Sequence, residues 1–263
     1  MKIARMYWRL AHWSFILATV ACGAATQSTL HAPSSPSGVT PAVPPSFSVL
    51  VFSRTEGFRH DSIPAGVSAI RQLGQQRGFS VDASEDAGTF ADELLIKYKV
   101  VVFLSTTGDV LNTAQQAAFE RYIRAGGGFV GIHSATDTEY DWPFYGALVG
   151  AYFAGHPDIQ TATVQVDSSV NASTASLPRL WIRKDEWYNF QKNPRGSVDV
   201  LATLDERTYS GGTMAGDHPI MWSHTYEGGR AWYTAGGHTT ESYSEPLFVD
   251  HLGKGILWAA GAI

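Results

Sequence analysis

The feature that most constrains this fold is a run of apolar residues, Val100–Leu104, that shows no polar alternation. A strand with one face in water alternates apolar and polar residues, whereas a strand of a parallel sheet is covered on both faces. Phe47–Phe52 and Phe129–Ile132 are further apolar runs of strand length. These runs predict an open sheet whose parallel strands lie between two layers of helices.

Helical segments separate these strands. Ser62 suits the N-cap of a first helix, and Gly78 is expected to end it. Thr113 and Gln116 have the spacing of a capping box, which places the start of another helix at Thr113. The alternation of strands and helices predicts an α/β fold.

The second half of the chain is less regular. Alternating residues predict strands at 161–167 and 198–204. Two more strands, at 219–223 and 230–234, are joined by a Gly-containing turn and predict a hairpin. Residues 248–260 form an amphipathic pattern that predicts a closing helix.

The N-terminal residues are predicted to be a targeting segment. Residues 1–22 combine basic residues with a short apolar stretch, the layout of a signal peptide. Cys22 ends this stretch in a pattern that resembles a bacterial lipoprotein signal, and plain secretion is the alternative. Residues 23–46 are rich in Pro and Ser and predict a tether, so the domain spans 47–263. We therefore expect an exported protein, either periplasmic or anchored to a membrane by lipid.

The composition of the chain excludes several classes of binding partner and site. Charged residues make up 16% of the chain, against about 25% in an average protein. The net charge is −5 and no cluster of Lys or Arg occurs, which argues against a nucleic-acid partner. The single cysteine excludes a disulfide framework and a metal site made only of cysteines. A membrane is expected only through the N-terminal lipid.

Histidines are the main candidates for chemistry. The chain has nine, and six lie in the domain near strand ends, Gly or Pro: His60, His133, His156, His218, His224 and His238. In open α/β sheets, ligands bind beyond the carboxyl ends of the strands. His60, His133 and His238 each follow a predicted strand, so we expect them to converge there. Histidines serve as general acids and bases, and they also bind metals.

Several motifs occur in the order found in the ThuA-like (trehalose utilisation) family. They share histidines, aromatics and glycines, and they lie at residues 52–63, 131–135, 155–157, 185–188, 219–222 and 229–238. The resemblance covers about residues 47–261. The family is similar in fold to class I glutamine amidotransferases, which implies a flavodoxin-like three-layer sandwich with a mostly parallel sheet.

The same resemblance sharpens the role of His133. Amidotransferases carry a nucleophilic Cys at a sharp strand-to-helix turn, and His133 stands at that place in this sequence. The domain contains no Cys, so thiol chemistry is excluded. His238 falls near the amidotransferase histidine, and Glu241 is expected to be its carboxylate partner.

Residues near these histidines are expected to hold a sugar. Aromatic rings stack on sugar C–H surfaces, and carboxylates accept hydrogen bonds from hydroxyl groups. The candidates for contacts with the substrate that combine these chemistries are Arg59, His60, His156, Glu186, Trp187 and Tyr188.

The resemblance implies an enzyme that acts on a sugar or an oxidised (keto) glycoside by lyase, hydrolase or isomerase chemistry. His133 and His238 are expected to be the acid and base, and Glu186 is a further catalytic candidate. Either His60 or Glu186 is expected to orient the substrate. A divalent metal such as Zn²⁺, bound by His60, His133 and His238, would polarise a carbonyl. The alternative is a non-catalytic carbohydrate-binding or envelope scaffold domain.

Overall fold

The structure, a computed structural model, describes residues 46–167 and 171–263. The expected signal peptide, the lipidation of Cys22 and the tether up to residue 45 lie outside these ranges. In the part of the chain that the structure describes, no helix is long and apolar enough to cross a membrane.

Strands and helices alternate through the first half of the domain, and strands dominate the second half. The helices are α1 (Ile63–Arg77), α2 (Asp92–Leu95), α3 (Thr113–Arg124), α4 (Pro143–Val149) and α5 (Pro246–Ala259). The strands are β1 (Phe47–Phe52), β2 (Phe79–Ser84), β3 (Val100–Leu104), β4 (Gly128–Ile132), β5 (Phe153–Gly155), β6 (Gln160–Val166), β7 (Leu180–Asp185), β8 (Asn189–Phe190), β9 (Asp199–Leu204), β10 (His218–Tyr226) and β11 (Gly229–Thr234).

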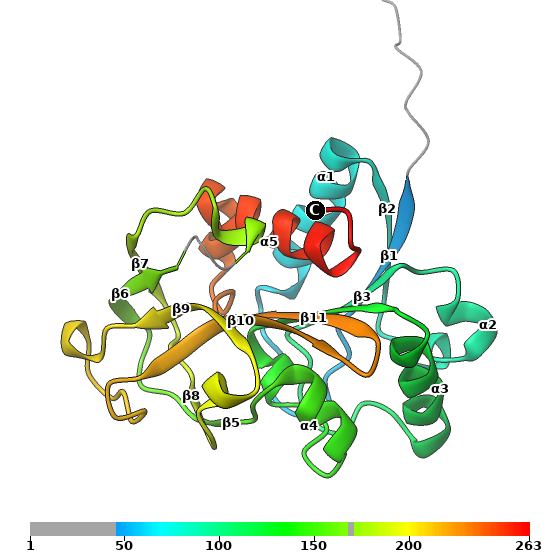
Figure 1. Cartoon of the computed structure of the whole chain (residues 1–263), viewed down its shortest axis with the longest axis horizontal. Coiled ribbons are helices and arrows are strands. Elements are labelled where there is room, and N and C mark those ends of the chain that lie inside the picture. Colours follow the sequence, from blue (N-terminus) through cyan, green and yellow to red (C-terminus); the bar gives the residue numbers. More distant parts are fainter. Residues whose placement is uncertain (1–45, 168–170) are drawn as a thin grey trace, which may run out of the picture. The chain divides into compact units, whose positions relative to one another are not determined.

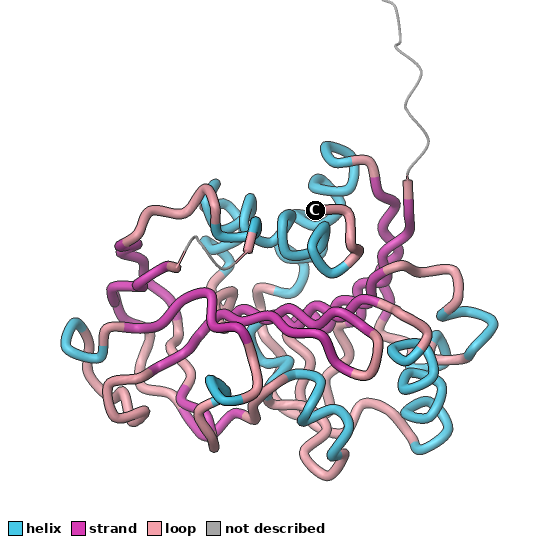
Figure 2. Tube along the Cα trace, viewed as in Figure 1, coloured by secondary structure: helices cyan, strands magenta, loops and turns pink. Residues whose placement is uncertain are grey.

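A nine-stranded mixed sheet forms the centre, in the order β2-β1-β3-β4-β11-β10-β9-β6-β7. The strands from β2 to β11 pair in parallel, and those from β11 to β7 pair antiparallel. Figure 1 shows α1 and α5 on one side of the sheet and α3 and α4 on the other. Figure 2 shows the sheet as a continuous band between these helices. The predicted α/β sandwich is confirmed.

Local predictions hold best where the apolar signal is strong. β1 and β3 have the predicted bounds, and every residue of β3 is buried. Gly78 ends α1 in the left-handed conformation, with φ at 78°. The predicted cap of α3 is wrong, because Asn112 rather than Thr113 is the N-cap and forms the capping box with Gln115. An amide oxygen at Asn112 accepts the first free N–H groups of the helix equally well.

Ser62 occupies the N-cap position of α1 but does not cap the helix. Its hydroxyl donates instead to the carbonyl oxygen of Gly237, at 3.1 Å, in a buried contact. This bond joins the start of α1 to the loop after β11. Two loops at the carboxyl ends of parallel strands are therefore held together.

A buried carboxylate joins the loops that follow β3 and β4. Glu139 is 1% exposed and has a left-handed φ of 56°. Its Oε1 accepts hydrogen bonds from the backbone N–H groups of Val110 (2.9 Å) and Leu111 (2.7 Å), and its Oε2 accepts one from Gln116 Nε2 (2.6 Å). The carboxylate thus satisfies polar groups that the fold buries.

Replacing Glu139→Ala leaves these buried donors without an acceptor. We expect the free energy of unfolding to fall by about 2–4 kcal/mol, measured by urea denaturation. Glu93→Ala, at an exposed position of α2, is the matched control and should change the stability by about 0.5 kcal/mol or less. Equal stability of the two variants would contradict this account of Glu139.

Candidate functional site

Three histidines from separate loops meet at the carboxyl edge of the parallel strands. His60 lies between β1 and α1, His133 follows β4 directly, and His238 lies after β11. The Nε2 atom of His133 is 3.1 Å from Nε2 of His60 and 3.2 Å from Nδ1 of His238. The structure therefore brings together the three residues that the sequence placed at strand ends.

His133 sits at a sharp turn between β4 and a 3₁₀ turn, and its φ of 52° is left-handed. A non-glycine residue in this conformation carries strain of order 1–3 kcal/mol, which persists where the surroundings fix it. Its Nδ1–H donates to the carbonyl oxygen of Ala235, at 2.9 Å. That bond fixes the ring orientation and leaves the lone pair of Nε2 facing the other two histidines when the ring is neutral.

Glu186 completes the cluster from the connection between β7 and β8. Its Oε2 lies 3.1 Å from His238 Nδ1 and 3.5 Å from His133 Nε2, and its Oε1 lies 3.1 Å from His156 Nδ1. Burial alone would raise the pKa of Glu186, but the bonds and charges of His133 and His238 outweigh it and hold the pKa well below its usual range. Glu186 is therefore ionised at neutral pH.

The histidines differ in protonation. Burial, together with the nearby His133 and His238, lowers the pKa of His60 to about 3, so His60 is neutral. For His238, burial lowers the pKa, but the hydrogen bond and charge of Glu186 raise it above its usual value overall. The cluster thus combines a neutral imidazole with a carboxylate–histidine pair.

Asp185 holds the cluster together from beneath. It is fully buried, and it accepts hydrogen bonds from the backbone N–H groups of Gly237 (2.9 Å), His238 (3.1 Å) and Glu186 (3.0 Å). The guanidinium of Arg183 lies 3.0 Å from the same carboxylate. Asp185 therefore fixes the backbone of two members of the cluster at once.

The four donor side chains fit a metal ion. One ligand atom from each of His60, His133, His238 and Glu186 lies within 4.8 Å of the others. Metal–ligand distances of about 2.0–2.1 Å in a tetrahedral zinc site place the ligand atoms about 3.3–3.4 Å apart. Four of the six separations, at 3.1–3.5 Å, are close to that geometry, and the other two are within 4.8 Å.

Two expected substrate contacts lie elsewhere. Arg59 is exposed and forms an ion pair with Glu85, at 2.7 Å, so it does not line the cluster. Trp187 is fully buried, and its Nε1 donates to the carbonyl oxygen of Gln160, at 2.8 Å. Its ring packs in the core and offers no face to a sugar. The sequence motif could not separate Trp187 from its neighbours, because aromatic residues serve both roles.

Two other expected contacts do border the cluster. The side chain of His156 is 41% exposed and touches Glu186. Tyr188 is 3% exposed, and the centroids of its ring and the His133 ring are 4.3 Å apart. Burial raises the pKa of Tyr188 well above its usual value, so its hydroxyl keeps its proton.

The prediction that Glu241 is the carboxylate partner of His238 is wrong. Glu241 is exposed in a 3₁₀ turn, and Glu186 takes that place. Asp185 is a further residue of the site that the sequence motifs did not single out. A signal for Asp185 was present, because polar residues interrupt the apolar pattern along β7 at positions that turn out to be buried.

His218 and His224 are held by local bonds outside the cluster. His218 is fully buried, and its Nε2–H donates to the carbonyl oxygen of Tyr188, at 2.7 Å, while Nδ1 lies 3.0 Å from Glu206. His224 contacts the carbonyl oxygen of Ala147, at 3.2 Å. His218 thus supports the connection that carries Tyr188, and His224 joins β10 to α4.

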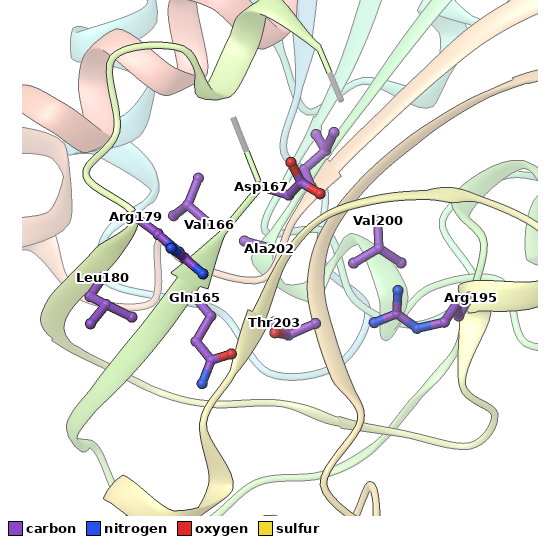
Figure 3. Close-up of a pocket in the computed structure, with 10 residues that line it drawn as sticks. Gln165, Val166, Asp167, Arg179, Leu180, Arg195, Val200, Ala202 and Thr203 are labelled. Atoms are coloured by element: carbon purple, nitrogen blue, oxygen red, sulfur yellow. The ribbon is translucent and has the colours of Figure 1, made fainter. Parts of the chain in front are cut away.

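A separate hollow of about 770 Å³ lies on the antiparallel half of the sheet (Figure 3). Its walls carry the side chains of Arg179, Gln165 and Thr203. The guanidinium of Arg195 at its rim is paired with Asp217. The hollow contains none of the converging histidines, so its size does not make it the better candidate site.

Comparisons with known proteins agree with this architecture. The sequence model of the ThuA family, described as trehalose utilisation, matches residues 48–259. The fold is similar to a ThuA-like protein from Bacteroides uniformis, with a TM-score of 0.72, 24% identity, and coverage of 87% of this chain and 95% of that one.

A ThuA-like protein from Parabacteroides merdae has a TM-score of 0.69 and 21% identity, covering 83% of this chain and 90% of that one. A β-galactosidase from Bacillus circulans shares the fold over 82% of this chain and 31% of its own, with a TM-score of 0.54 and 14% identity. No curated protein matches the chain. The family match confirms the resemblance seen in the motifs: the chain belongs to the ThuA family, which is described as a trehalose utilisation family.

Proposed function

We propose that this protein is a metal-assisted enzyme that cleaves oxidised (keto) glycosides by elimination. The family description relates the chain to carbohydrates. The observation that carries the proposal is the convergence of three imidazoles and a carboxylate at the carboxyl edge of the sheet. These side chains suit a substrate with a ketone beside a C–H group. Imidazoles can hold a metal that acts as a Lewis acid on the ketone, and the carboxylate can take the proton.

In this proposal His60, His133 and His238 hold a divalent cation such as Zn²⁺. Neutral imidazole nitrogens are its preferred ligands among the groups present, and the bond from His133 Nδ1–H to Ala235 is the second contact that orients such a ligand. When bound, the cation supplies polarisation of a carbonyl oxygen.

Glu186 is then the general base. It takes the proton from the carbon next to the ketone, and the C–H electron pair becomes a C=C bond while the carbonyl π pair moves to oxygen. When that pair returns, the double bond shifts to the next carbon and the glycosidic C–O bond breaks with its electrons on the leaving oxygen. His156, 3.1 Å from Glu186, passes the proton on to that oxygen. The products are an unsaturated keto sugar and the free alcohol.

We further propose that the protein is exported and carries a lipid on Cys22. The support is the sequence pattern of residues 1–22. Such a lipid would leave the enzyme attached to a membrane and facing substrates outside the cytoplasm.

Metal binding is tested on the purified protein by elemental analysis and thermal unfolding. We expect one zinc per chain, and its removal by a chelator should lower Tm by about 5–10 °C, because a ligand at one hundred times its Kd stabilises the fold by about 2.7 kcal/mol. His133→Ala should lose the metal on dialysis. His156→Ala, which removes a histidine that touches Glu186 but not the three proposed ligands, is the control and should keep it. A wild-type protein that binds no metal would refute this part.

The base is tested by Glu186→Gln. We expect kcat on a methyl 3-keto-glucoside to fall by about 10²–10⁴-fold, because the amide cannot accept the proton. Metal content should stay close to one per chain, since the three histidines remain. Unchanged turnover would assign the base elsewhere. Absence of wild-type turnover, with sugar binding that survives His133→Ala, would favour the non-catalytic carbohydrate-binding domain.

Lipidation is tested by feeding cells an alkyne analogue of palmitate. The wild-type protein should be labelled and partition with membranes, and Cys22→Ser should abolish both, because the thiol that carries the lipid is absent. An unlabelled wild-type protein in the exported fraction would indicate plain secretion.

A further inference from the structure

Tyr188 lies between β7 and β8 and is held rigidly. It is 3% exposed, and its carbonyl oxygen accepts a hydrogen bond of 2.7 Å from His218 Nε2–H. His218 is in turn fully buried and bonded to Glu206 and to the hydroxyl of Tyr209. The position of the Tyr188 ring is therefore set by the fold rather than by solvent.

The ring of Tyr188 packs against its neighbours and has no face left for a sugar. Ring centroids lie 4.3 Å from His133 and 4.3 Å from Phe153, and the ring stacks on His156 at 5.9 Å with an interplanar angle of 24°. The expected stacking on a sugar is therefore not available to it. What the residue can still offer is its hydroxyl group.

The hydroxyl of Tyr188 has no hydrogen-bond partner among the described residues. Three other buried tyrosines differ in this respect: the hydroxyls of Tyr122, Tyr145 and Tyr233 donate to the carbonyl oxygens of Gly128, Ala135 and His133 respectively. The hydroxyl of Tyr243 also lacks a partner among the described residues, but it is sealed from solvent. The Tyr188 hydroxyl, by contrast, is absent from the atoms sealed from solvent, so a ligand can reach it.

We propose that the Tyr188 hydroxyl is a catalytic hydrogen-bond donor to the substrate's carbonyl oxygen, stabilising the negative charge that forms there. The inference rests on the proposed function, because the charge develops when Glu186 removes the neighbouring proton. Donors fixed before the reaction stabilise such charge most strongly, since they need no reorganisation. The ring that carries the hydroxyl lies beside His133, with the two ring centroids 4.3 Å apart.

Glu186 and the Tyr188 hydroxyl then act at opposite ends of the C–C=O unit of the substrate. Glu186 receives the proton from the carbon, and Tyr188 holds the oxygen to which the carbonyl electrons move. The phenol keeps its own proton throughout, so the step stays balanced between the substrate carbon and the Glu186 carboxylate.

The test uses Tyr188→Phe in the full chain, which removes the hydroxyl and keeps the ring packing. We expect kcat on methyl 3-keto-glucoside to fall by about 10²–10³-fold and KM to rise by about fivefold to tenfold, with metal content close to wild type. Tm should not fall, because the hydroxyl bonds to nothing in the described chain. Tyr122→Phe is the matched control: it removes a hydroxyl that is bonded, at the opposite end of β4, and should lower Tm without changing kcat.

A second measurement separates this inference from the proposed reaction. Affinity for methyl 3-keto-glucoside, measured by calorimetry in the Glu186→Gln background, should fall about fivefold to tenfold on adding Tyr188→Phe. If no wild-type turnover is found but this loss of affinity is, the proposed reaction fails and the donor stands. If kcat and affinity both stay within threefold of their references, Tyr188 is not the donor.

Discussion

The arrangement of the site depends on one buried carboxylate, Asp185. Burying a charge fully costs several kcal/mol of folding free energy unless hydrogen-bond donors surround it. Moving one of these donors away would restore part of that cost, so the donors are held in place. Those donors are the backbone N–H groups of Gly237, His238 and Glu186, the hydroxyl of Ser242 and the guanidinium of Arg183. The same carboxylate thus sets the backbone on both sides of the carboxylate–histidine pair.

This link matters because its ends belong to distant strands. β7 and β11 are separated by β10, β9 and β6 in the sheet, yet the end of β7 reaches the loop that follows β11. A twisted sheet curls, which allows its far edge to return toward the centre. Arg183 on the inner face of β7 also bonds Glu245 at the start of α5, so strand and helix close around the site. Glycine at position 236 leaves room for that guanidinium, since a Cβ there would lie 2.4 Å from Arg183 Nη1.

The sequence predicted those parts of the fold and site that depend on local pattern. Apolar runs such as Val100–Leu104 predict buried parallel strands. The carboxyl ends of parallel strands lie at one edge of the sheet, so the convergence of His60, His133 and His238 could be predicted from the topology. β7 was missed because its alternation includes charged residues on the buried face, among them Arg183. Arg183 pairs with Asp185 on the same face of β7, but the groups that hold these two charges in the interior, the loop after β11 and Glu245, lie far away in the sequence. No local pattern reveals those distant contacts.

The residues 185–188 show why neighbouring positions take unrelated roles. Beyond the end of β7 the chain enters the interior, so successive side chains are buried in different directions instead of alternating with solvent. Asp185 bonds the loop after β11, Glu186 reaches the histidines, and Trp187 packs in the core with its N–H on Gln160. Tyr188 then meets His133. The polar side-chain atoms of Asp185, Glu186 and Trp187 thus find partners within the chain, whereas the phenol of Tyr188 has none among the described residues. This difference is the reason for proposing that the phenol meets a bound substrate.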